Sequence, residues 1–184
     1  MFLLFLCHHL LNQHWHKSLT RGRYSPARVL SAVVNLLLLI IMLALMWSGI
    51  TQSKYLFAFL PQGGGALIAR TVHLAAAYWG FVLMSFHTGL HGGMFLKLGK
   101  KIFPLSKTPK YGGIVARLAA VCISIYGVYA LSRRQLGEYM FLKTQYVFFD
   151  FNEPLFFFVA DYISIMLLFA FSGYYVLHFC KINR

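Results

Sequence analysis

The chain has 184 residues, of which 59% are hydrophobic and only 11% are charged. So few polar side chains cannot cover a soluble globule, which excludes a soluble enzyme and indicates an integral protein of the lipid bilayer. The formal net charge of +13 could suggest a nucleic-acid partner, but the basic residues lie in short loops between apolar segments, where they act as topology signals, so we expect no nucleic-acid binding.

Five apolar helices are predicted in one domain over residues 1–184, giving an all-α membrane helical bundle with a four-helix core. Residues 2–15 form a short first helix, because about 14 residues fall below the 17 or so that a bilayer requires. The full spans are residues 29–50, 66–96, 114–131 and 155–179. Ser25 and Pro26 favour a helix start, glycines 63–65 break the chain before the third helix, and Pro104 and Pro109 lie in the next connector. The segment 135–153 is rich in Tyr and Phe, as interfacial segments are.

Basic residues are distributed unequally between the two predicted faces. Segments 17–28 and 97–117 and the carboxyl-terminal tail hold 12 of the 17 Lys and Arg residues. Because cytoplasmic loops are enriched in Lys and Arg, the amino terminus is predicted outside and the carboxyl terminus inside. His87 and His91 then lie near the cytoplasmic side and His73 near the outer side.

These three histidines lie on one face of the third helix. His73 and His87 are 14 residues apart, a rise of roughly 21 Å with a rotation only about 40° short of four turns. His91 extends the same face by one turn. Ionisable residues inside a membrane span are costly, so such a column predicts a functional site.

The first helix carries a similar pattern, in which His8 precedes Asn12 by four residues as His87 precedes His91. Both helices run in the same direction, so His8 or His9 can lie at the depth of His87 or His91. Two neutral imidazoles from facing helices are the usual ligands of a haem b iron. The predicted cofactor-binding residues are His8, His73, His87, His91, Arg70 and Gly89, with His8, His87 and His73 as haem-iron ligands. Gly89 and the glycines after it would leave room for the macrocycle, and Arg70 or Arg117 would hold propionates.

Other interpretations of the histidines compete with haem. His9, His14, His16 and His178 lie at helix ends, where a hydrogen bond to a neighbouring group is the preferred interpretation. Structural zinc needs four close Cys or His ligands, whereas His73 and His91 are about 27 Å apart along the helix. The three cysteines form neither CxxC nor CxxCH, which argues against a disulfide framework, a zinc ribbon and c-type haem.

Two polar residues in the spans carry weaker predictions, and no catalytic residues are predicted. Asp161 is predicted to be a solvated or arginine-paired interfacial acid, with a proton or hydrogen-bond role as the alternative. Asn35 is predicted to make a helix–helix hydrogen bond. No nucleotide-binding loop, nucleophile triad or carboxylate pair is found, so a subunit of an oxidoreductase system is favoured over a stand-alone enzyme.

The order of several motifs resembles one known family. These motifs are HHLLNQHW, KSLTRGRYSP, WSGI, RTVHLAAAYWGFVLMSFHTGLH, YGVYALSRR and DYISIMLLFAFSGYY. Together they resemble the flavinylation-associated cytochromes, small bacterial membrane proteins that are similar to the cytochrome b subunits of formate dehydrogenase and hydrogenase. The most specific parts are H-x13-H-x3-H and H-x3-N-x2-W.

The resemblance implies haem b, one or two per chain, in the cytoplasmic membrane of a bacterium. It further implies electron transfer between the cytoplasmic or quinone side and an outer-surface redox partner that can carry covalent FMN. His8 and His87 match the family's inner ligands and His73 an outer ligand. The family's other outer histidine would fall before Met1. We therefore expect one of three outcomes: the true start lies upstream, a partner chain supplies the missing ligand, or only one haem is bound. The alternative function is a non-redox membrane subunit whose histidines bind metal or serve the structure.

Overall fold

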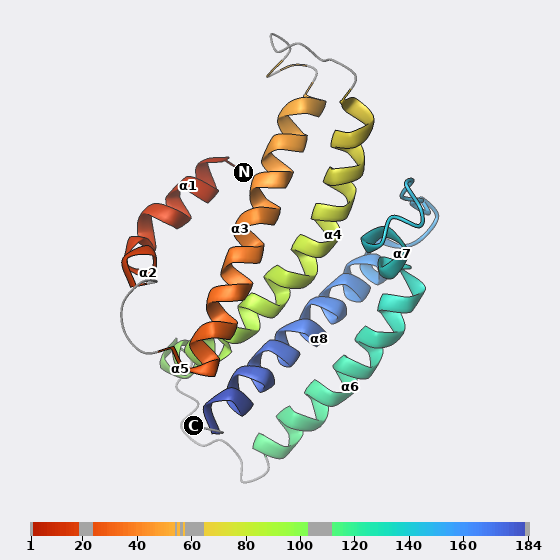
Figure 1. Cartoon of the computed structure of the whole chain (residues 1–184). Coiled ribbons are helices and arrows are strands. Elements are labelled where there is room, and N and C mark those ends of the chain that lie inside the picture. The colour runs from red at the N-terminus through yellow and green to blue at the C-terminus, as the bar shows by residue number, and fades with distance from the viewer. Residues whose placement is uncertain are drawn as a thin grey trace.

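The computed structural model describes residues 2–18, 24–53, 55, 57, 65–102 and 112–182, and every regular element in these ranges is a helix (Figure 1). The helices are α1 (Phe2–Leu11), α2 (Gln13–Ser18), α3 (Pro26–Gln52), α4 (Ala66–Leu90), α5 (Gly92–Ile102), α6 (Gly112–Arg133), α7 (Leu136–Met140) and α8 (Leu155–Ile182). Within the described residues, α3, α4, α6 and α8 are long and apolar enough to cross a membrane. The predicted all-α membrane bundle is therefore confirmed, and Pro104, Pro109 and glycines 63 and 64 lie outside the described residues.

The four long helices alternate in direction along the chain (Figure 1). α4 packs against both α3 and α8, and α6 packs against α8. The helix with the histidine column therefore has a neighbour on each side. Its amino-terminal end lies beside the end of α3, and its carboxyl-terminal end lies near the start of α3 and the end of α8.

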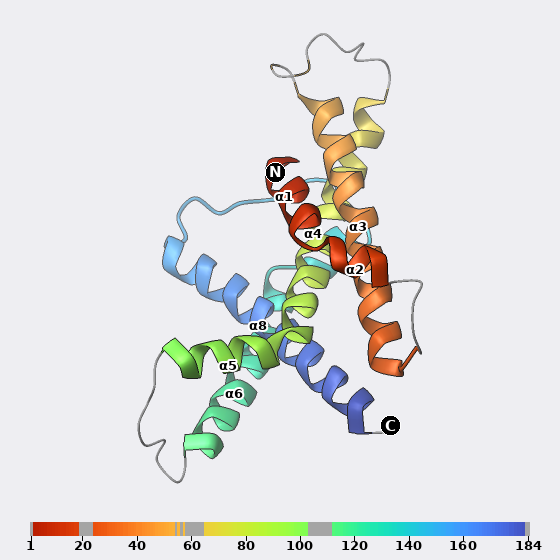
Figure 2. The ribbon, with the colours of Figure 1, turned by 90° about the vertical axis from the view of Figure 1, so that its left-hand side faces the viewer.

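The histidine helix ends earlier than the sequence predicts. The predicted span 66–96 is wrong at its end, because α4 stops at Leu90 and the backbone of His91 leaves helical geometry with φ −92° and ψ 4°. The N–H of His91 bonds to the carbonyl of Thr88 at 3.1 Å. The chain then enters α5, which leaves the bundle sideways (Figure 2). Glycine at position 92 leaves room for α8, because a Cβ there would lie 3.0 Å from the ring of Tyr174.

Glycines let α4 and α8 approach each other closely. A Cβ on Gly89 would overlap the backbone of Ala170, and one on Gly173 would overlap the carbonyl of Phe86. Small residues at such crossings are typical of helix packing in membranes. The prediction that Gly89 leaves room for a macrocycle is therefore wrong, because the space beside it is filled by α8.

The first helix stands apart from this tight packing. α1 is ten residues long and has no buried residue, and both views place it beside α3 (Figures 1 and 2). That the first helix is too short to cross a bilayer is confirmed, but the predicted single helix 2–15 is wrong, because the chain turns at Asn12 and α2 follows.

Candidate functional site

A cavity of about 420 Å³ lies between the α1–α2 segment and the α3–α4 pair. Five histidines line it: His8, His9 and His16 from the first segment, and His87 and His91 from α4. The remaining lining is mostly apolar, with Asn12 and Asn35 as the other polar side chains apart from the indole of Trp15. Such a volume and lining are typical of small-molecule and cofactor sites. The structure thus brings together four of the histidines that the sequence places at one depth, His8, His9, His87 and His91, and adds His16.

Hydrogen bonds on the α1 side distinguish His8 from His9. Nδ1 of His9 lies 3.0 Å from Nε2 of His16, so the two rings are hydrogen-bonded to each other, as expected for histidines at helix ends. Asn12 ends α1: its side-chain Nδ2 and its backbone N both donate to the carbonyl of His8, at 2.8 and 3.1 Å. Among the described residues, no hydrogen bond engages the ring of His8. Its imidazole is therefore the more available ligand on this side.

On the α4 side, the rings of His87 and His91 are in edge contact, with centroids 4.8 Å apart. Nδ1 of His87 is buried and has no hydrogen-bond partner in the part of the chain that the structure describes. Of the two ring nitrogens, Nε2 is therefore the one that can bind a ligand in the cavity that His87 lines. His91 is exposed, at the end of the helix. His87 therefore presents one nitrogen to the cavity from a firmly packed helix.

His73 lies outside this cavity, at the other end of α4. Its Nδ1 lies 3.0 Å from Oγ of the fully buried Ser48 on α3. Ser48 Oγ also lies 3.2 Å from the carbonyl of Leu45, which can only accept; when the hydroxyl donates to that carbonyl, its oxygen accepts from the Nδ1–H of His73. This tautomer leaves the lone pair of His73 on Nε2, which is the form a metal ligand needs.

The two arginines predicted to hold propionates lie away from the inner cavity. Arg70 is at the start of α4, where its guanidinium stacks over the ring of Tyr146 at 4.7 Å. Arg117 is an exposed residue of α6, a helix that packs on α8. That Arg70 binds a haem propionate stays a prediction, and it applies only to a haem at the depth of His73.

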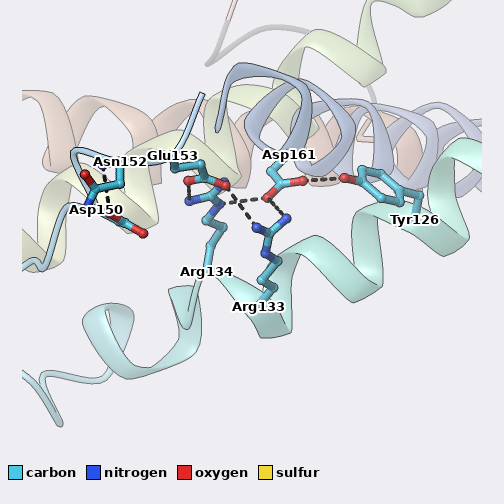
Figure 3. Close-up of polar contacts among 7 residues, drawn as sticks. All are labelled: Tyr126, Arg133, Arg134, Asp150, Asn152, Glu153 and Asp161. Carbon is cyan, nitrogen blue, oxygen red and sulfur yellow. Dashed lines mark hydrogen bonds and ion pairs between the residues drawn. The ribbon is translucent and has the colours of Figure 1, made fainter. Parts of the chain in front are cut away.

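A second polar cluster joins α6, α8 and the loop before α8 (Figure 3). Asp161 is completely buried; its carboxylate accepts from the Tyr126 hydroxyl at 2.6 Å, from Arg134 Nε at 2.8 Å and from Arg133 at 3.4 Å. Of the two predictions for Asp161, arginine pairing is confirmed and solvation is wrong. Both arginines also donate to Glu153, so two cations face two carboxylates.

The same hydrogen bonds set the charge state at the loop end of this cluster, outside the spans. The Arg134 guanidinium, which donates to both carboxylate oxygens of Glu153, holds the pKa of Glu153 below its ordinary value. Reciprocally, Glu153 raises the pKa of Arg134. Glu153 and Arg134 therefore stay ionised at neutral pH, and their hydrogen bonds tie the loop to the end of α6.

Sequence reasoning missed two residues of the histidine sites. Ser48 was not singled out, although the WSGI motif contains it, because its partner His73 lies on another helix. His16 was assigned to a helix end, although its spacing of seven residues from His9, two helical turns, could have suggested the contact.

Comparison with models of protein families, with curated proteins and with solved structures finds no match to this chain. Within the described ranges, no group of three or more His, Cys, Asp or Glu side chains lies close enough to hold a metal ion by itself. A haem iron takes only two protein ligands, so this finding concerns ions held by side chains alone.

Proposed function

We propose that the chain binds haem b in the cavity between α1 and α4 and relays electrons through the membrane. The observation that carries this proposal is the placement of imidazoles from two separate helices on the walls of one largely apolar cavity. His8 and His87 are the proposed iron ligands. When bound, haem supplies reversible one-electron chemistry, and the protein tunes it through the ligands and their surroundings.

The residues present fit such a group. His87 offers Nε2 to the cavity, and the ring of His8 is held by no hydrogen bond among the described residues. The aliphatic and thioether side chains of Leu38, Met42 and Met84 on α3 and α4 would exclude water from the face of a flat ligand. The family resemblance of the sequence supports the same assignment.

His73 marks a second, outer level about 21 Å away along α4. We propose one haem at the inner level of this chain and assign His73, through its free Nε2, to a second haem where another ligand is supplied. The outer redox partner is proposed to be a protein that carries FMN, and the inner one a quinone or a cytoplasmic donor.

The visible spectrum of the purified protein tests the proposal. A sharp α-band of b type after reduction supports haem, and a colourless protein that takes up no added haem overturns it in favour of the non-redox alternative. His87→Ala should abolish the band. His178→Ala, which removes a histidine of α8 outside the cavity, is the matched control and should keep it. A band that survives His87→Ala would move the ligand to His91 or refute the site.

The orientation is a separate part of the proposal. It places α5 and the carboxyl terminus in the cytoplasm and the loop before α8 outside. With the three native cysteines replaced by serine, an impermeant thiol reagent on intact cells should label a cysteine introduced at the exposed Asn152 and spare one at the exposed Lys101. The opposite labelling would reverse the inner and outer sites.

A further inference from the structure

Two buried polar atoms beside the histidine cavity have no hydrogen-bond partner within the described residues. They are Oδ1 of Asn35 on α3 and Nδ1 of His87 on α4. Buried polar groups are nearly always paired, because an unpaired one loses its hydration without compensation. Two such atoms at one cavity require an explanation.

The packing of α3 against α4 places these two residues at the same depth. Ser48 on α3 contacts His73 on α4. Seven residues before Ser48 and seven after His73, Ile41 lies against Gly80, where a Cβ would come within 3.1 Å of the Ile41 side chain. The helices are antiparallel, so six more residues bring Asn35 level with Phe86, immediately before His87. Both Asn35 and His87 also line the same cavity.

The chemistry of the two atoms is complementary. Oδ1 of an asparagine side chain is only an acceptor, whereas Nδ1 of a neutral histidine is a donor in one of its two tautomers. We propose that Asn35 accepts a hydrogen bond from Nδ1–H of His87 and thereby fixes the tautomer that presents the Nε2 lone pair to the cavity. The two side chains would rotate from their positions in the structure to form this bond. Asn35 is thus a positioning residue for His87.

The hydrogen bond between Asn35 and His87 requires no cofactor. Its effect on a bound iron rests on the proposed function. Groups that accept from the outer nitrogen of a ligating histidine fix the ring and raise its basicity, and their removal typically weakens metal binding by about 10- to 100-fold. Asn35 would play the part for His87 that Ser48 plays for His73.

Nitrogen NMR of histidine-labelled protein without haem, in detergent, tests the hydrogen bond directly. We expect His87, assigned by its loss in His87→Ala, in the Nδ1–H tautomer in the unmodified chain, and a shift towards the Nε2–H tautomer in Asn35→Leu. Ser31→Ala removes a hydroxyl one turn earlier on α3, which bonds to the carbonyl of Ala27, and should change nothing. An Nε2–H tautomer of His87 in the unmodified chain overturns the proposal, even if Asn35→Leu fails to fold. The same tautomer in the unmodified chain and in Asn35→Leu also overturns it.

Haem titration supplies the second measurement. Asn35→Leu should bind haem about 10- to 100-fold more weakly than Ser31→Ala, and Asn35→Asp should lower the midpoint potential because an anionic acceptor makes the ligand more basic. Unchanged affinity and potential would refute the positioning role. If the unmodified chain binds no haem, the proposed function fails, and the tautomer still decides whether Asn35 holds His87.

Discussion

Replacing Asp161 with asparagine should destabilise the protein clearly more than removing the charge of the exposed Asp150, which lies at the same end of the bundle. The carboxylate is completely buried and accepts from Tyr126, Arg134 and Arg133. Asp161→Asn keeps the size of the side chain but removes the charge that compensates the arginines. The side chain of Arg134, only 15% exposed, cannot turn fully to water instead.

The size of the effect follows from these contacts. Breaking a buried ion pair by removing one partner typically costs about 3–5 kcal/mol. Arg134 retains two hydrogen bonds to Glu153, so its charge is not left without compensation, and we expect the lower end, about 3 kcal/mol. Tyr126→Phe removes one hydrogen bond to a charged group, which is worth about 1.5–3 kcal/mol. The double variant should lose less than the sum, because both changes act on one carboxylate.

Unfolding in mixed detergent micelles, followed by far-UV circular dichroism, measures these free energies. Asp150→Asn is the matched control, because Asp150 is exposed and its side chain accepts from one backbone N–H, that of Asn152 (Figure 3). It should cost about 1 kcal/mol or less. An Asp161→Asn variant no less stable than Asp150→Asn would refute the inference that the buried cluster stabilises the α6–α8 pair.

Two further predictions concern the pH response and the helix crossing. Because Arg134 holds the pKa of Glu153 below its ordinary value of 4.5, this carboxylate contributes stability that is fully present above pH 4.5 and is lost as the pH falls through the lower folded-state pKa. Glu153→Gln should therefore lose less stability on acidification than the unmodified chain, and equal losses in pH-dependent thermal melts would contradict this. Gly89→Ala should lower the free energy of unfolding by about 1–3 kcal/mol or more, because the added methyl overpacks against Ala170. Gly93→Ala is the control: its Cβ would meet open space, so the free energy of unfolding should change by no more than about 0.5 kcal/mol. Similar melting temperatures for both variants would argue against the close α4–α8 approach.

The membrane spans and the histidine column could be predicted from the sequence alone because their signals are local. A run of apolar residues long enough to cross a bilayer marks a span whatever it packs against. The fixed rotation per residue of an α-helix likewise places His73 and His87 on one face before any neighbour is known. Ser25 and Pro26 mark the start of α3 in the same way, and the structure shows Ser25 accepting from the N–H of Arg28.

Only the tertiary structure decided which side chains meet, because contacts between helices depend on register and crossing geometry that no local pattern encodes. Gly89 was predicted beside a cofactor, yet it lies against Ala170 because α8 crosses α4 at that point. Asp161 was predicted to be either solvated or paired with arginine, and only the packing decided between the two: arginines at the end of α6 contact it and it is completely buried. The pairing of Ser48 with His73 and the level placement of Asn35 with His87 follow from the antiparallel packing of α3 on α4. The sequence determines where each imidazole lies along its helix, and the packing of that helix against its neighbours determines which hydrogen-bonding groups face it.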